Sequence, residues 1–325
     1  MIDLSVSCGG LALANPVMPA SGTFGLEQAG IFDFERLGAF VTKTITPDKR
    51  MGNPTPRVSE VPNGMLNSIG IPSKGAAAFV RDVIPRFSQW RPPLVVSISA
   101  NTPDAFADLA RTVSVEGVAA IEINISCPNL EDDGKAFAMR PESTREIVRR
   151  LRDATALPLW AKLTPNAGDV AAVAQAAQDG GADALVVANT ILAMSVDVTT
   201  RRPSLGNVMG GLSGPAVKPI ILRMAYQCAR AATIPVIGCG GISTARDALE
   251  FLIVGCRAVQ VGTASFVHPS ALVDVVDGLE AHCRETGIAR IEDVIGSLDL
   301  TQAEHDMMGG AAPASDPAAY AEAHA

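Results

Sequence analysis

Eight short runs of consecutive apolar residues recur along the chain of 325 residues. They lie at Pro16–Ala20, Ala39–Thr42, Leu94–Ile98, Ala119–Ile125, Leu157–Leu163, Ala184–Ala188, Ile234–Gly238 and Ala258–Val261. A strand that faces water on one side alternates apolar and polar residues, whereas these runs are apolar almost throughout. The pattern is typical of strands that are buried on both faces of a parallel sheet.

Helical patterns lie between many of these runs, at Pro103–Val113, Pro141–Ala154, Val170–Asp179, Lys218–Ala232 and Thr244–Val254. Strands that alternate with helices indicate βαβ units. Eight such strands match the (β/α)8 TIM barrel, an α/β fold of about 250 residues. A doubly wound sheet is the main alternative, but no G-x-G-x-x-G follows any predicted strand. We therefore predict a single (β/α)8 domain over residues 1–302.

The catalytic groups of such a barrel lie at the C-terminal ends of its strands. In this chain the small and polar residues at those ends are Ser21, Lys43, Ser97, Asn124 with Cys127, Lys162, Asn189 with Thr190, Gly240 with Gly241, and Gly262 with Thr263. The last two pairs belong to glycine-rich turns after the seventh and eighth runs. Barrels of this kind bind phosphate there, through free backbone N–H groups.

Two connections, Thr46–Lys74 and Ile191–Pro215, are longer than a turn requires. Long loops in compact domains usually serve a function, often as lids. We therefore expect both to cover the strand ends. The alanine-rich segment 303–325 is predicted to be a flexible tail.

Cys127 stands in the motif INISCPN, where Pro128 ends an apolar strand and places the thiol in the loop that follows. No two of the six cysteines, at positions 8, 127, 228, 239, 256 and 283, lie within four residues of each other. This spacing fits neither a zinc site nor an iron–sulfur cluster, so no metal is predicted. By position alone Cys127 is either a catalytic thiol or a small buried residue, and we expect the other five to be small buried residues.

The net charge of −8 provides no basic face for phosphates, which argues against a nucleic-acid partner but leaves room for a pocket that binds one small anion. The N-terminal residues do not have the basic and apolar segments of a signal peptide. No stretch reaches the roughly 18 apolar residues of a membrane helix. We expect a cytoplasmic protein with reduced thiols.

Nine motifs follow one another along the chain: NPVMPASGTFG, VTKT, NSIGIP, INISCPN, AKLTPN, ANT, GGLSGPAVKP, IGCGGI and VQVGTA. Together they resemble the class 1 dihydroorotate dehydrogenases, and most of all the NAD-linked 1B type, over residues 2–298. The resemblance implies a barrel that binds one non-covalent FMN and oxidises dihydroorotate to orotate in pyrimidine biosynthesis. It also implies a homodimer, joined by a partner subunit with FAD and a [2Fe–2S] cluster into a heterotetramer that reduces NAD.

The same resemblance assigns roles to single residues. Cys127 resembles the family's catalytic base, and Lys43 resembles the lysine that contacts both flavin and substrate. The substrate contacts would be Lys43, Asn67, Ser68, Ile69, Gly70, Ile71, Asn124, Asn129, Asn189 and Thr190. The FMN contacts would be Ser21, Lys43, Thr44, Ser97, Asn124, Lys162, Ala188, Gly214, Gly240, Gly241, Gly262 and Thr263. Ser97 departs from the family pattern, in which asparagine is common at this position.

Four alternatives remain open at this point. A fumarate-linked class 1A enzyme would work without a partner subunit, and a dihydropyrimidine dehydrogenase-like subunit would act on uracil or thymine. A Schiff-base aldolase would use Lys43 or Lys162, and a non-catalytic barrel would only bind a phosphate ligand. Class 2 enzymes are disfavoured, because they use a serine base and carry an N-terminal membrane extension.

Overall fold

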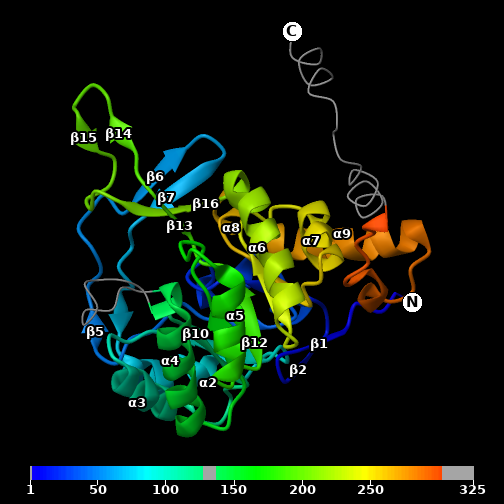
Figure 1. Cartoon of the computed structure of the whole chain (residues 1–325), viewed down its shortest axis with the longest axis horizontal. Coiled ribbons are helices and arrows are strands. Elements are labelled where there is room, and N and C mark those ends of the chain that lie inside the picture. The colour runs from blue at the N-terminus through cyan, green and yellow to red at the C-terminus, as the bar shows by residue number, and fades with distance from the viewer. Residues whose placement is uncertain (1, 127–136, 302–325) are drawn as a thin grey trace, which may run out of the picture.

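The computed structural model describes residues 2–126 and 137–301. Within this part of the chain the eight predicted strands pair into one parallel sheet, in the order β3-β18-β17-β12-β11-β10-β9-β4. Two of these strands, β10 and β12, are labelled in Figure 1. All eight overlap the predicted runs, and their ends shift by at most two residues. Their bounds are β3 Val17–Pro19, β4 Phe40–Val41, β9 Leu94–Ile98, β10 Ala120–Asn124, β11 Leu159–Lys162, β12 Ala184–Val187, β17 Val236–Cys239 and β18 Ala258–Val261.

The two outer strands of this order, β3 and β4, come together and bring the sheet close to a full barrel. The backbone N–H of Gly38 donates to the carbonyl oxygen of Val17 at 2.8 Å. A Cβ at position 38 would lie 2.1 Å from the carbonyl oxygen of Asn15, so only glycine permits this approach. The prediction of a (β/α)8 barrel is therefore confirmed.

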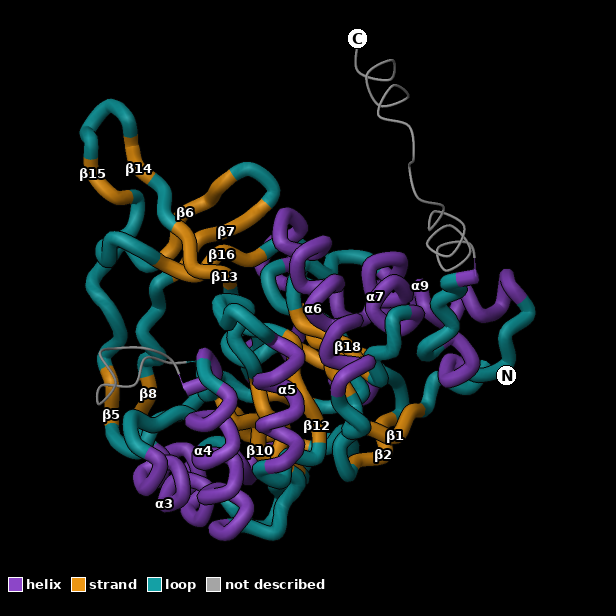
Figure 2. Tube along the Cα trace, viewed as in Figure 1, coloured by secondary structure: helices purple, strands orange, loops and turns teal. Residues whose placement is uncertain are grey.

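The five predicted helices are present on the outside of the barrel (Figure 2). α3 Pro103–Val113, α4 Pro141–Ala154 and α5 Val170–Asp179 have the predicted bounds. α6 Lys218–Ala231 is one residue shorter than predicted at its C-terminal end, and α7 Ala245–Ile253 is one residue shorter at each end. α7 ends just before Gly255, which has a positive φ of 110° as expected for a helix stop. The helices that the sequence patterns did not single out are α1 Ala76–Asp82, α2 Ile84–Phe87, α8 Ala264–Val267 and α9 Ala271–Thr286.

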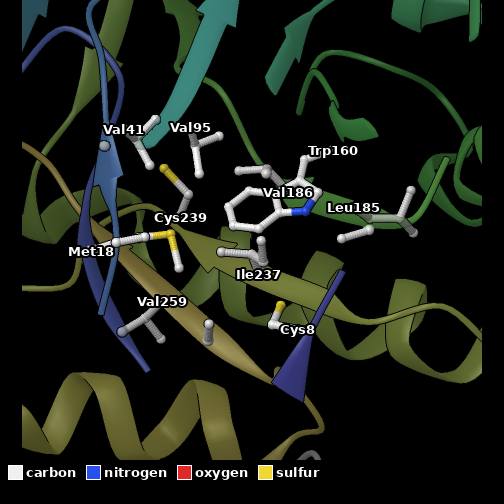
Figure 3. Close-up of a cluster of buried hydrophobic side chains, with 14 of the residues drawn as sticks. Cys8, Met18, Val41, Val95, Trp160, Leu185, Val186, Ile237, Cys239 and Val259 are labelled. Carbon is white, nitrogen blue, oxygen red and sulfur yellow. The ribbon is translucent and has the colours of Figure 1, made fainter. Parts of the chain in front are cut away.

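The interior of the barrel is apolar in its middle and polar near the C-terminal ends of the strands. Met18, Val95 and Ile237 surround the indole of Trp160, and all four side chains are fully buried (Figure 3). Lys162 follows Trp160 by two positions on β11, so both side chains point inward. The polar layer that contains Lys162 also holds Ser97, Glu122 and Gln260, none of which is exposed to solvent.

A β-hairpin that we did not predict stands before the first barrel strand. It consists of β1 Val6–Cys8 and β2 Leu11–Leu13, which pair antiparallel. Gly9 and Gly10 form its turn with φ values of 50° and 84°. A Gly-Gly pair between two short runs is a recognisable signal for such a turn, so this element could have been found in the sequence.

The two long connections form antiparallel sheets that extend from one end of the barrel (Figures 1 and 2). The largest has the order β13-β16-β7-β6, so that strands from both connections pair with each other. The bounds are β6 Val58–Val61, β7 Gly64–Asn67, β13 Ile191–Ala193 and β16 Gly210–Ser213, with the two-residue strands β5 Lys49–Arg50, β8 Ser73–Lys74, β14 Val196–Asp197 and β15 Arg202–Pro203. Within residues 2–126 and 137–301, no helix is long and apolar enough to cross a membrane.

Candidate active site

The ammonium group of Lys162 is a deeply buried charge at the C-terminal ends of the strands. Only 3% of the residue is exposed. Its Nζ donates to Ser21 Oγ and to Gln260 Oε1, both at 3.2 Å, and lies 3.8 Å from Glu122 Oε1. The barrel thus carries a fixed positive charge at the position where the sequence predicts the flavin.

The charge state of Lys162 follows from its neighbours. Burial by itself lowers the pKa of the ammonium, but Cys239 and the carboxylate of Glu122 oppose this, and the pKa ends above its ordinary value. Burial raises the pKa of the Cys239 thiol, so that this sulfur is neutral near pH 7. Cys239 and Glu122, whose Oε1 lies 3.8 Å from Nζ, are thus the two neighbours that favour the protonated form of Lys162.

Asn124 and Asn189, which the family resemblance assigns to the substrate site, are brought together by the fold. Asn124 is 7% exposed and ends β10. Its Nδ2 donates to Thr44 Oγ1 at 3.4 Å, and its Oδ1 accepts from Asn189 Nδ2, also at 3.4 Å. The backbone N–H of Thr190 donates to Asn189 Oδ1 at 2.8 Å. These amides form one connected group at the ends of three strands.

The predicted substrate loop, Asn67 to Ile71, is held in place by the antiparallel sheet. Asn67 Nδ2 donates to the carbonyl oxygen of Gly211 at 3.3 Å. Ser68 Oγ accepts from Asn53 Nδ2 at 2.8 Å and from Asn207 Nδ2 at 2.9 Å. Both long connections therefore contribute to the shape of this loop. Its end is a tight bend, in which φ is 75° for Gly70 and 48° for Ile71.

Lys43 follows β4 and lines a cavity of about 230 Å³, together with Thr44, Ser73, Lys74 and Arg86 among others. The residue as a whole is exposed, yet its ammonium is partly desolvated by surrounding protein atoms. This loss of water, and then the charge of Arg57, lower the pKa of Lys43, while Glu27 opposes the shift. Lys43 therefore loses its proton at a lower pH than an ordinary lysine.

The two glycine-rich turns follow β17 and β18 as predicted. Gly240 and Gly241 have φ values of 148° and 76°. A Cβ at position 241 would lie 2.7 Å from the backbone of Lys218, so the start of α6 packs directly on this turn. Lys218 Nζ donates to Asp247 Oδ1 at 2.7 Å and to Glu250 Oε1 at 2.9 Å, which joins α6 to the start of α7.

The second turn, Gly262 with Thr263, also approaches the antiparallel sheet. Thr263 Oγ1 donates to Ser213 Oγ at 2.8 Å, and Ser213 precedes Gly214, which has a φ of 101°. Ser265, two residues further on, has the only buried side-chain oxygen without a hydrogen-bond partner among the described residues. A buried hydroxyl normally has a partner, so this turn is suited to a ligand that brings an acceptor.

The described residues fit FMN. The turns at Gly240 and Gly262 and the unpartnered hydroxyl of Ser265 suit a phosphate. Lys162, Thr44 and Asn124 offer a buried cation and polar groups for a flavin ring. Ser21, Ala188 and Gly214 also lie at this end of the barrel. Ser97, by contrast, is fully buried and hydrogen bonded to Thr44 and Glu122, and its predicted contact with FMN stays a prediction.

Several predictions fall outside the described residues. These are the roles of Cys127 and Asn129 and the predicted flexible tail 303–325. The other five cysteines are buried thiols, as predicted. Burial raises the pKa of Cys8, against the charge of Arg257, to about 12. No group of three or more metal-ligating side chains occurs in the part of the chain that the structure covers.

Two residues of this site, Glu122 and Gln260, were not predicted from the sequence. Both lie inside apolar runs, in IEIN and VQVG, at fully buried positions. A polar residue inside a run that is otherwise apolar is itself a signal, because a buried polar group needs a partner. Which partner it finds depends on strands that are distant in sequence.

Comparison with known proteins places the chain in a family. The family model for dihydroorotate dehydrogenase matches residues 3–283. The catalytic subunit of dihydroorotate dehydrogenase B (NAD(+)) from Pelobacter propionicus is 47% identical over 300 residues, which cover 91% of this chain and 99% of that protein. The subunit of the same name from Desulforudis audaxviator is 48% identical over 303 residues, 92% of this chain and 99% of that protein. The chain therefore belongs to the dihydroorotate dehydrogenase family.

Proposed function

We propose that this chain is the catalytic subunit of an NAD-linked dihydroorotate dehydrogenase, which oxidises dihydroorotate to orotate in pyrimidine biosynthesis. The observation that carries the proposal is the buried ammonium of Lys162 at one end of a barrel whose neighbouring strands carry Asn124, Asn189 and two glycine turns. Two relatives that are 47% and 48% identical over nine-tenths of the chain are named as catalytic subunits of this enzyme. We also assign the chain to the cytoplasm.

One non-covalent FMN would occupy the end of the barrel. Gly240, Gly241, Gly262 and Thr263 would hold its phosphate through backbone N–H groups. Ser21, Lys43, Thr44, Ser97, Asn124, Lys162, Ala188 and Gly214 would surround the ring and its side chain. When bound, FMN supplies the acceptor for the hydride that leaves C6 of dihydroorotate. Lys162 would compensate the negative charge that the reduced ring acquires.

The substrate would lie between the ring and the loop Asn67–Ile71. Lys43 would pair with the carboxylate of dihydroorotate, while Asn67, Asn124 and Asn189 would bind its ring amides, with Asn129 and Thr190 beside them. A carboxylate next to a cation of fixed position is what distinguishes dihydroorotate from uracil or thymine. Residues Ser68 to Ile71 would close the pocket against water.

The second half of the reaction is removal of the proton at C5. Cys127 would take this proton as a thiolate, because a thiol with a pKa of about 8.5 is partly ionised near neutral pH. Cys8 and Cys228 cannot serve, since burial raises their pKa to about 12.

Electrons would leave through a second subunit. The relatives are named as catalytic subunits of NAD-linked enzymes, and this chain has no G-x-G-x-x-G for a dinucleotide. The partner would carry FAD and a [2Fe–2S] cluster, bound outside a homodimer of this chain in a heterotetramer.

A spectrum and an acceptor assay test the proposal. The pure chain, reconstituted with FMN, should show flavin absorbance that bleaches when dihydroorotate is added without oxygen. It should then reduce artificial dyes but not NAD until the partner is added. Efficient turnover with fumarate would assign the class 1A activity instead, and bleaching by dihydrouracil but not dihydroorotate would assign a dihydropyrimidine dehydrogenase. No flavin after reconstitution would refute the proposal.

A further inference from the structure

We propose that Glu122 is a positioning residue that orients two parts of the active site at once, the ammonium of Lys162 and the amide of Asn124. The proposal rests on the proposed function, because that function assigns Lys162 to the flavin and Asn124 to both the flavin and the substrate. Glu122 lies below both in the barrel and is not exposed at all. Two chains of hydrogen bonds end on its two carboxylate oxygens.

The first chain leads to Lys162 through Gln260. Lys162 Nζ donates to Gln260 Oε1 at 3.2 Å, and Gln260 Nε2 donates to Glu122 Oε2 at 2.7 Å. The amide of Gln260 thus has its oxygen toward the cation and its nitrogen toward the anion. If this amide were rotated by half a turn, its NH2 group would face the ammonium of Lys162, so that two donors would meet. Its oxygen would then face the carboxylate of Glu122, so that two acceptors would meet. Glu122 therefore determines the orientation of the Gln260 amide, and this amide in turn holds the ammonium of Lys162 in position.

The second chain leads to Asn124 through two hydroxyl groups. Ser97 Oγ donates to Glu122 Oε1 at 3.0 Å and lies 2.9 Å from Thr44 Oγ1. Because Ser97 has one proton and gives it to the carboxylate, Thr44 must donate to Ser97. The oxygen of Thr44 is then free to accept from Asn124 Nδ2 at 3.4 Å.

This direction of donation determines which way the Asn124 amide faces. With Nδ2 toward Thr44, Oδ1 is left to accept from Asn189 Nδ2 and from the backbone N–H of Ser126, both at 3.4 Å. Each donor in the chain from Asn189 points toward the carboxylate. A buried carboxylate accepts only, so it imposes one polarity on the whole chain. A glutamine at position 122 would not impose one direction of donation, because its neutral amide can both donate and accept.

A purely structural role is the rival explanation, since loss of any buried hydrogen bond destabilises a fold. The two chains allow a test that separates the explanations, because they share only Glu122. If Glu122 positions the site, breaking the first chain mainly changes the flavin midpoint potential, and breaking the second chain mainly changes the affinity for orotate. If Glu122 only stabilises the barrel, breaking either chain should lower the melting temperature. Neither break should then act more on the flavin potential than on orotate binding, or the reverse.

The test uses the FMN-reconstituted chain with Gln260→Leu, Ser97→Ala and Glu122→Gln. The control is Ser114→Ala, which loses the hydroxyl contact of 2.6 Å between Ser114 and Thr155 at the opposite end of the barrel. For each protein one measures the flavin midpoint potential, the orotate Kd and the melting temperature. A double variant, Gln260→Leu with Lys162→Met, tests whether the first chain acts through the lysine.

We expect Gln260→Leu to lower the flavin potential and leave the orotate Kd within about twofold. Ser97→Ala should raise the orotate Kd roughly three- to tenfold, as for one lost hydrogen bond, and should change the flavin potential less than Gln260→Leu does. Glu122→Gln should change both quantities, and Ser114→Ala only the melting temperature. In the Lys162→Met background, Gln260→Leu should have no further effect on the potential.

Equal effects of Gln260→Leu and Ser97→Ala on both quantities, or effects on melting temperature alone, would overturn the proposal. A change of the flavin potential in Ser97→Ala as large as that in Gln260→Leu would also overturn the second chain. If Glu122→Gln does not fold, the proposal is decided by whether Gln260→Leu acts mainly on the flavin potential and Ser97→Ala mainly on the orotate Kd. A wild-type protein that binds FMN but neither binds orotate nor reacts with dihydroorotate would refute the proposed function, and the potentials with and without Lys162 would still test the first chain.

Discussion

The indole N–H of Trp160 donates a hydrogen bond to the backbone carbonyl oxygen of Gly9, over a distance of 2.9 Å. Trp160 projects into the barrel from β11, and Gly9 lies in the turn of the β1–β2 hairpin. The hairpin is thereby attached to the interior of the barrel, and a large side chain finds a partner for its one polar group.

This contact predicts that Gly9→Ala destabilises the protein. The added Cβ would lie 2.4 Å from Trp160 Nε1, at a φ of 50° that side chains rarely adopt. Overpacking and the positive φ together should lower the free energy of unfolding by about 2–4 kcal/mol. Gly287→Ala is the matched control, because φ is 74° there but no atom lies within 4 Å of the new Cβ. Urea unfolding that gives equal losses for the two variants would contradict the prediction.

A second prediction concerns Asp247, which caps α7 and pairs with Lys218 beside the turn at Gly240. Burial raises the pKa of the Asp247 carboxyl, but hydrogen bonds from Lys218, Ser243 and Thr244 outweigh this and hold it below its usual 3.8. Because the folded-state pKa is depressed, the stabilisation is present above that usual value and is lost as pH falls through the depressed pKa. Asp247→Asn should therefore cost about 1–2 kcal/mol at pH 7.

The difference between this variant and wild type should shrink in acid. Unfolding curves at pH 7 and near pH 3 measure it directly. A cost of the same size at both pH values would show that the charge of Asp247 is not what stabilises the capping interaction.

A third prediction concerns the pH dependence of orotate binding. Partial loss of water and the charge of Arg57 lower the pKa of Lys43, so this lysine loses its proton at a lower pH than an ordinary lysine. Below that pKa it is a cation that attracts the orotate carboxylate, and above it the attraction disappears. The orotate Kd should rise as pH increases through this pKa, while Lys43→Ala should bind weakly at every pH.

Lys74→Ala is the control, because Lys74 lines the same cavity but has no assigned role. Titration of the flavin spectrum with orotate at several alkaline pH values gives both affinities. A Lys43→Ala protein with wild-type affinity would remove Lys43 from the substrate site.

A fourth prediction concerns the proposed base. Cys127→Ser should slow flavin reduction by dihydroorotate by roughly 10²–10⁴-fold, the usual cost of losing a general base. The wild-type rate should rise with pH as the thiolate forms, and the serine variant should lack this rise. Stopped-flow reduction is the measurement, and Cys8→Ala, at a fully buried cysteine, should keep the wild-type rate. If Cys127→Ser reduces its flavin at the wild-type rate, Cys127 is not the catalytic base.

Much of the barrel could be predicted from local patterns. The apolar runs located all eight strands, because a strand buried on both faces has to be apolar at successive positions. The helices α3, α4 and α5 had the expected bounds, since a proline opens α3 and α4 and Gly180 and Gly181 close α5. The β1–β2 hairpin was missed because its strands are only three residues long, although the Gly-Gly turn was a usable signal.

The sequence by itself determined which residues stand at the ends of the strands, because position after an apolar run is a local property. Local pattern alone was enough to assign Lys162, Asn124 and the glycines of the two turns to one mouth of the barrel. Only the tertiary structure decided that Glu122 of β10 accepts from Ser97 of β9 and from Gln260 of β18. These partners are separated by 25 and 138 residues, and no local pattern specifies which distant group satisfies a buried charge. Closure of the barrel brings them together, because inward side chains of all its strands share one interior.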